Sequence, residues 1–162
     1  MSATAAKQAL TKQDRALTMT RSFDAPRALV WKAWTDPKHF LNWWGPRHHP
    51  AVNVAMDVRV GGRWRHCLRS TETGADLWHG GVFREVIKPE RLVFTFTWEE
   101  EGERGVETVV TVTFAERDGK TLMMFHQAPF QSDFQRDDHD GGWNSTFDRL
   151  ADLLTTAKGS AQ

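Results

Sequence analysis

Between residues 51 and 128, apolar side chains recur at every second position through most of the chain. In residues 91–98, for example, one face carries only apolar side chains: Leu92, Phe94, Phe96 and Trp98. A period of two is typical of a β-strand with one buried face. Gly, Pro and Asp turns divide the segment into about six strands, and strands joined by short turns pair antiparallel. The segment therefore predicts an antiparallel sheet that must bury one face.

The C-terminal part of the chain has helical periodicity instead. Its apolar residues recur at spacings of three and four: Trp143, Phe147, Leu150, Ala151 and Leu154. This spacing predicts one long helix with an apolar face, which is suited to cover the sheet. Residues 135–142, QRDDHDGG, are expected to form a loop and an acidic first turn ahead of that helix.

The N-terminal part adds a strand and two short helices. Residues 16–23 alternate as a strand, and Asp24 with Pro26 marks the start of a helix. Asp36-Pro37 repeats this start signal, and Gly45-Pro46 ends the second helix. The predicted fold class is α+β, a curved antiparallel sheet wrapped around a long C-terminal helix. We expect residues 16–158 to form a single domain behind a flexible leader of residues 1–15.

The composition of the chain bears on which partners it can bind and on where in the cell it is located. The 162-residue chain balances 21 basic against 21 acidic residues, so no broad field favours nucleic acid or an anionic membrane. No apolar run approaches the roughly 18 residues that span a bilayer. The single cysteine, Cys67, excludes an internal disulfide. We expect a cytoplasmic protein with no membrane or nucleic-acid partner.

Motifs for cofactor and metal chemistry are lacking. The sequence has no phosphate-binding glycine loop, no nucleophile elbow and no HExxH or CxxC pair. His39, His48 and His49 cluster around two tryptophans, but their spacing matches no ligand set. We expect no cofactor and no metal, and interpret residues 37–50, PKHFLNWWGPRHHP, as a short helix and a Gly-Pro turn that leads into the next strand.

Several segments together resemble a known family. They are FDAPRALVWKAWTDP (23–37), NWWGP (42–46), DVRVGGRWR (57–65), GGVFREVIKPERLVFTFTW (80–98), TVVTVTF (108–114) and GGWNSTFDRLADLL (141–154). In order and content they resemble the SRPBCC superfamily, with its START-like helix-grip fold, and within it the activator of heat-shock protein 90 ATPase homologue group. The resemblance implies a deep pocket between the sheet and the C-terminal helix that receives apolar small molecules in many relatives.

Ring-rich strand faces supply a candidate lining for that pocket. The candidate ligand-binding residues are Trp44, Trp64, His66, Phe94, Phe96, Trp98, Phe125, Gln127, Trp143 and Phe147. A mostly apolar wall with few polar groups is the usual composition of a small-molecule site. The expected ligand is a small apolar or aromatic molecule, although the same rings could instead fill the space as an ordinary core.

Two other functions stay open. His66 is a weak candidate for a general acid or base in a cyclase- or hydrolase-like reaction. The family resemblance also allows a chaperone-regulating interaction module, with chaperone contact, and a homodimer. His79 and Glu85 lie an even number of positions apart on one predicted strand, which places them on the same face unless a bulge separates them. They are a further candidate pair for catalysis.

Overall fold

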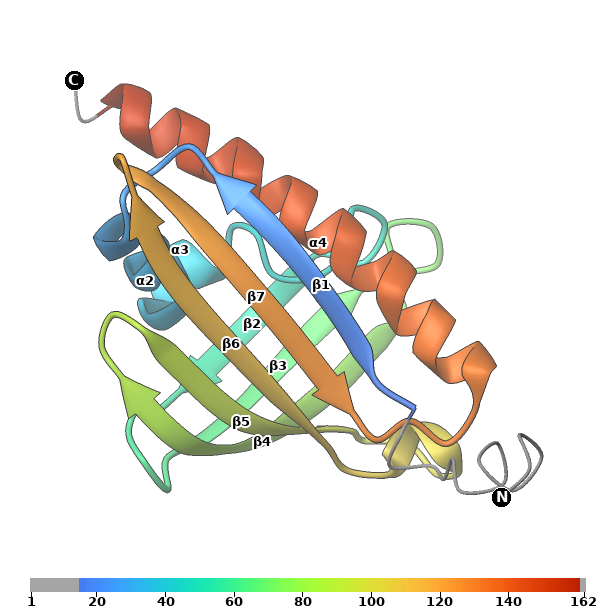
Figure 1. The fold of residues 1–162 in the computed structure, drawn as a ribbon. Helices are drawn as coiled ribbons and strands as arrows, with labels where there is room; N and C mark the ends of the chain where they lie inside the picture. Colours follow the sequence, from blue (N-terminus) through green and yellow to red (C-terminus); the bar gives the residue numbers. More distant parts are fainter. Residues whose placement is uncertain (1–14, 161–162) are drawn as a thin grey trace, which may run out of the picture.

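Seven antiparallel strands form one sheet in the order β1-β7-β6-β5-β4-β3-β2 (Figure 1). The structure is a computed structural model that describes residues 15–160 and the side chains of residues 15–156. The strands are β1 Leu17–Phe23, β2 Ala51–Met56, β3 Arg63–Arg69, β4 Asp76–Ile87, β5 Arg91–Trp98, β6 Thr108–Arg117 and β7 Lys120–Ala128. The helices are α2 Arg27–Thr35, α3 Pro37–Phe40, the 3-10 turn η2 Glu103–Gly105 and α4 Asp133–Ser160. The predicted α+β order is confirmed.

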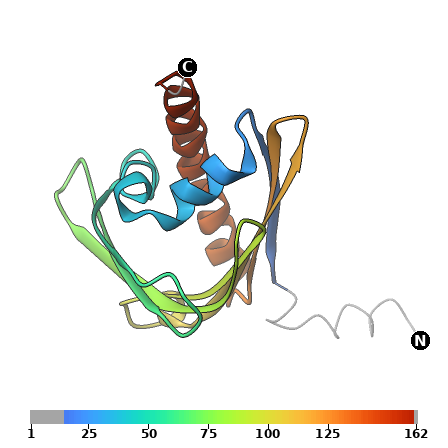
Figure 2. The same cartoon turned by 90° about the vertical axis from the view of Figure 1, so that its left-hand side faces the viewer.

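The sheet curves into a trough, and all the α-helices lie on its concave side. Figure 2 shows α4 along the open side of the trough, with α2 and α3 beside it. The first and last strands of the chain pair with each other: β1 forms one edge of the sheet beside β7, and β2 forms the other edge. The concave face of the sheet and these helices enclose the hydrophobic core.

Strand periodicity assigns the faces of the sheet as expected. In β3, Trp64, His66 and Leu68 are buried, whereas the arginines between and beyond them are exposed. The inward side chains meet the helices, and the outward ones meet water.

Helix α4 begins earlier than its sequence suggests. It starts at Asp133, so the prediction that residues 135–142 form a loop is wrong. Ser132 caps the helix: its hydroxyl accepts from the Gln135 amide at 3.0 Å, and the Gln135 side chain accepts from the Gln131 amide at 2.9 Å. This Ser-x-x-Gln cap and the packing of the first two turns outweigh the roughly 1 kcal/mol that each helical glycine costs. Because α4 begins at Asp133, His139 lies on the helix.

A bulge in β4 separates two residues that share sequence parity. The pairing of β4 with β5 shifts by one residue between Phe83 and Glu85. His79 therefore stays on the concave face and is buried, whereas Glu85 pairs with Arg91 across a half-exposed surface. The alternative left open by the sequence, that a bulge separates the pair, is the one present: His79 and Glu85 do not share a face, because the extra residue rotates the strand.

The expected leader lies almost entirely outside the described residues, which begin at residue 15. Within residues 15–160, none of the helices combines the length and the apolar character that crossing a membrane requires.

Candidate functional site

A cavity of about 260 Å³ lies between the concave face and the N-terminal half of α4. Its apolar wall comes from three strands, the α3–β2 segment and the helix: Trp44, Leu68, Leu77, Phe96, Trp98 and Trp143. Its polar groups are His49, His79, Arg104, Asp138, His139 and Thr146. An engineered apolar cavity of about 150 Å³ binds benzene, so this one has room for a larger aromatic molecule.

The ten candidate residues divide into three groups. Four line the cavity: Trp44, Phe96, Trp98 and Trp143. Three surround a second space of only about 10 Å³: Trp64, His66 and Phe94. The last three pack in the core: Phe125, Gln127 and Phe147. The concave face is thus filled at one end and open at the other.

Side chains from the short helices cause this division. Trp34 of α2 and Phe40 of α3 reach into the trough and occupy the space in front of Trp64 and Phe94. The ring of Phe40 lies 4.8 Å from that of His66. A void of about 10 Å³ holds at most one water, so this end of the trough is an ordinary packed core.

Gln127 acts as a structural hydrogen-bonding group. Its amide nitrogen donates to the Thr108 hydroxyl at 2.9 Å, and its amide oxygen accepts from Trp143 Nε1 at 2.8 Å. The residue is fully buried. Both ends of its amide are therefore engaged, and its oxygen holds Trp143, whose ring forms part of the cavity wall.

His66 lies in the packed end of the trough, not at the cavity. Its Nδ1 accepts from the Ala55 amide at 3.3 Å. Burial lowers the pKa of its imidazole to about 3, so the ring is neutral near pH 7. This placement does not support His66 as a general acid or base, because a substrate in the cavity would not contact it.

Two other histidines border the cavity, and each is bonded to a cavity tryptophan. Trp44 Nε1 donates to His79 Nε2 at 2.8 Å, and Trp98 Nε1 donates to His139 Nε2 at 3.2 Å. His79 shares its face with Phe83 at strand spacing, and His139 precedes Trp143 by one helical turn. The alternation of residues along β4 would thus have identified His79 from the sequence. A correct start for α4 would have identified His139.

Arg104 lies in η2, within the charged segment EEEGERG (99–105), whose composition is typical of a solvated loop. Its guanidinium lies 4.5 Å above the Trp98 ring and forms ion pairs with Glu100 at 2.9 Å and Asp138 at 3.8 Å. Ser132 and Gln135 also bond to Glu103, which ties η2 to the start of α4. No periodic pattern in the sequence predicts the contact of Arg104 with Trp98, since η2 is a short turn between strands.

Residues 24–155 match the family described as Activator of Hsp90 ATPase homolog 1-like protein. The chain belongs to this family. The family resemblance drawn from the sequence segments is confirmed. No curated protein matches the chain.

Solved structures share the fold of this Activator of Hsp90 ATPase homolog 1-like chain. A protein from Chromobacterium violaceum is 23% identical with a TM-score of 0.80, covering 86% of this chain and 96% of its own. The AHSA1 protein from Silicibacter pomeroyi is 24% identical with a TM-score of 0.77, covering 88% and 99%. A protein from Mycobacterium smegmatis, Ms6760, is 25% identical with a TM-score of 0.73, covering 86% and 90%.

In this member of the Activator of Hsp90 ATPase homolog 1-like family, the NWWGP segment forms one rim of the cavity. Trp44 lines the cavity, whereas Trp43 is buried in the core and donates to the Ala33 carbonyl at 2.9 Å. Gly45 has a φ of +90°, and a Cβ there would lie 2.3 Å from the His49 carbonyl oxygen. Only glycine fits this turn.

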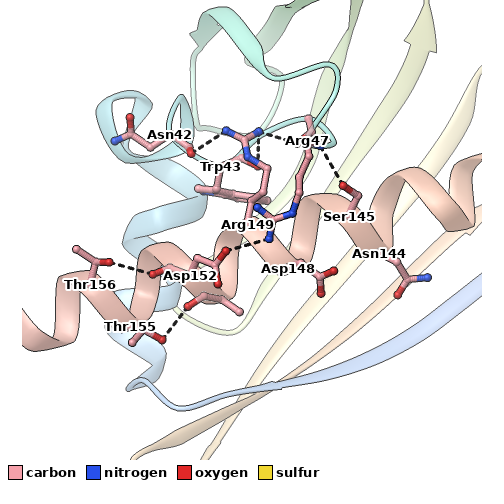
Figure 3. Close-up of polar contacts among 12 residues, drawn as sticks. Asn42, Trp43, Arg47, Asn144, Ser145, Asp148, Arg149, Asp152, Thr155 and Thr156 are labelled. Atoms are coloured by element: carbon pink, nitrogen blue, oxygen red, sulfur yellow. Dashed lines mark hydrogen bonds and ion pairs between the residues drawn. The ribbon is translucent and has the colours of Figure 1, made fainter. Parts of the chain in front are cut away.

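Arg149 of α4 fastens that rim (Figure 3). Its guanidinium donates to the carbonyls of Asn42, Trp44 and Gly45 at 3.1, 3.0 and 2.7 Å, and more weakly to that of Trp43 at 3.4 Å. Carbonyls that follow a helix end lack intrahelical partners. Arg149 donates to all four, and the Trp44 carbonyl also accepts from the Ala51 amide at 2.9 Å. Arg149 therefore positions Trp44.

Gly142 leaves part of the cavity open. It lies on α4 at the cavity wall, and a Cβ built there meets nothing within 4 Å. Its neighbour Gly141 is equally unobstructed but does not line the cavity. We therefore expect a larger side chain at residue 142, and not one at residue 141, to reduce the open volume.

Metal ligation has no support among the side chains that the structure describes, since no three His, Cys, Asp or Glu residues among them converge. His49 lines the cavity, whereas His39 and His48 are not among its lining residues.

Proposed function

We propose that this protein binds a small apolar or aromatic molecule in the cavity between the curved sheet and α4. The observation that carries the proposal is an open cavity of about 260 Å³ walled largely by aromatic rings. This is just below the roughly 300–1,000 Å³ typical of sites for drug-sized ligands, so the ligand is small.

The helical glycines add support. A glycine within a helix costs about 1 kcal/mol relative to alanine, and Gly142 lies at the cavity wall, where a Cβ would meet nothing within 4 Å. An alanine at this position would favour the helix, and the glycine instead keeps this part of the wall free of a side chain.

Naphthalene is a suitable probe because it is neutral, aromatic and small. Three tryptophans line the cavity, so their fluorescence reports occupancy directly. We expect saturable quenching of tryptophan emission and a rise in Tm, since a ligand that binds only the folded state stabilises it.

Matched leucine variants locate the site. We expect Gly142→Leu to weaken naphthalene binding at least 10-fold, because leucine occupies the cavity, while Gly141→Leu retains wild-type affinity. Equal binding to both variants would place the site elsewhere. Failure of naphthalene and other neutral aromatic probes to bind the wild type would refute the proposal.

A further inference from the structure

The polar edge of the cavity has a defined proton arrangement. An indole nitrogen can only donate a hydrogen bond. Trp44 and Trp98 donate to Nε2 of His79 and His139, respectively, so each Nε2 must offer its lone pair. The ring proton of each neutral histidine therefore sits on Nδ1.

Both histidines are neutral near pH 7. Burial, with a smaller contribution from Arg104, lowers the pKa of His139 to about 4. Burial, followed by the proximity of His66, lowers the pKa of His79 well below its usual value. The cavity thus has neutral N–H donors, not imidazolium cations.

The His139 donor is available to a ligand. Within residues 15–156, no hydrogen bond uses its Nδ1, although the residue lines the cavity. Nδ1 of His79 is also without a well-formed partner, but it is buried and has only a backbone contact with Leu77. Thr146 already donates its hydroxyl proton to the Gly142 carbonyl at 2.8 Å. A ligand acceptor therefore meets His139 first.

The charges at the cavity disfavour an anionic ligand. The guanidinium of Arg104 is already paired with the carboxylates of Glu100 and Asp138. A buried anion needs a free counter-charge and is otherwise strongly destabilised. A neutral acceptor avoids this penalty and still satisfies the imidazole donor.

We propose that the cavity selects a neutral aromatic molecule carrying a hydrogen-bond acceptor, such as an aryl ketone or quinone carbonyl, to which Nδ1–H of His139 donates. This rests on the proposed function and specifies its ligand class. His139 would select the ligand through this bond, while the rings supply most of the affinity.

Three probes of one shape test the selection. They are 2-acetylnaphthalene, 2-isopropenylnaphthalene (a CH₂ in place of the carbonyl oxygen) and 2-naphthoate (a carboxylate). A net hydrogen bond of about 1 kcal/mol corresponds to roughly a fivefold difference in affinity. We expect the ketone to bind about fivefold tighter than the alkene, and the carboxylate to bind more weakly than either.

Substitutions at His139 show whether its donor causes the preference. We expect His139→Phe to abolish the ketone preference while alkene binding changes less than about threefold, because a ring of similar size remains. His139→Gln retains a donor and an acceptor, and we expect it to keep part of the preference. The Nδ1 resonance of His139 in ¹⁵N NMR should shift with the ketone and not with the alkene, which gives a readout in the wild-type chain.

The outcomes separate the two proposals. Equal binding of ketone and alkene, tightest binding of the carboxylate, or a ketone preference that survives His139→Phe overturns the acceptor inference and leaves the cavity as a binding site. Failure of all three probes to bind overturns both.

Discussion

Arg149 connects α4 to the cavity rim through one side chain. Its guanidinium reaches four consecutive carbonyls at residues 42–45, two of which belong to Trp44 and Gly45 at the cavity wall. Arginine suits this role because its fork carries five donors in fixed directions. The rim position thus depends on a residue outside the cavity.

We expect Arg149→Met to lower the free energy of unfolding by about 2–3 kcal/mol, as hydrogen bonds from a charged donor are lost. Arg149→Lys should fall between the wild type and Arg149→Met, since an ammonium cannot span all four carbonyls. Urea denaturation measures both. A Lys variant as stable as the wild type would show that charge alone holds the rim.

Gln127 is a second residue whose role is structural. We expect Gln127→Leu to cost about 1–3 kcal/mol, because it leaves the buried Trp143 N–H without an acceptor. Adding Trp143→Phe removes that donor, so the double variant should be less destabilised than the sum of the single variants. Simple additivity in a double-mutant cycle would contradict the pairing.

At the scale of elements, the start of α4 determines where the polar edge of the cavity lies. The Ser132 cap begins the helix two turns before Asp140, and Gln135 ties it to η2. His139 and Arg104 meet across this junction, at the wall that also holds Trp98.

We expect Ser132→Ala to cost about 1 kcal/mol, the usual effect of removing an N-cap hydroxyl. Ser132→Thr keeps the acceptor and should stay within a few tenths of the wild type. Hydrogen exchange of the amides at residues 133–136 should accelerate in the Ala variant only. Unchanged exchange there would mean that packing, not the cap, holds the first turn.

At the scale of the whole molecule, three buried histidines couple stability to pH. The pKa values of His66, His79 and His139 are lowered in the folded state, chiefly by burial. In the unfolded chain a histidine titrates near about 6.5. Between that pH and the folded values, the unfolded chain binds more protons, so stability rises with pH.

We therefore expect full stability above about pH 6.5 and a progressive loss down to about pH 4, the value to which the pKa of His139 is lowered. Each histidine contributes up to about 1.4 kcal/mol per pH unit in that window, so the three give up to about 4 kcal/mol per unit. Urea midpoints measured between pH 4.5 and 7.5 at constant salt check the slope. His66→Gln should reduce the slope by about one proton, and a flat profile would contradict the neutral assignment.

The sequence predicts the elements well because their signals are local. The alternation in residues 91–98 and the helical spacing of Trp143, Phe147 and Leu150 reflect backbone geometry, and both patterns agree with the structure. The Ser132-x-x-Gln135 pattern is also a local N-cap signal, but the glycine pair that follows it favours a loop, and the helix start at Asp133 is therefore not predicted. Chaperone contact, a homodimer and a cytoplasmic location stay predictions.

By itself the sequence determined an antiparallel sheet with a ring-rich inner face, closed by a C-terminal helix, because periodicity and turn residues act over a few positions. Only the tertiary structure decided which rings border open space. That outcome depends on how far Trp34 and Phe40 reach into the trough, on the bulge that separates His79 from Glu85, and on an irregular turn that brings Arg104 to Trp98. A cavity is the space that remains between elements distant in the sequence once they have packed. No local sequence pattern encodes the size or position of that space.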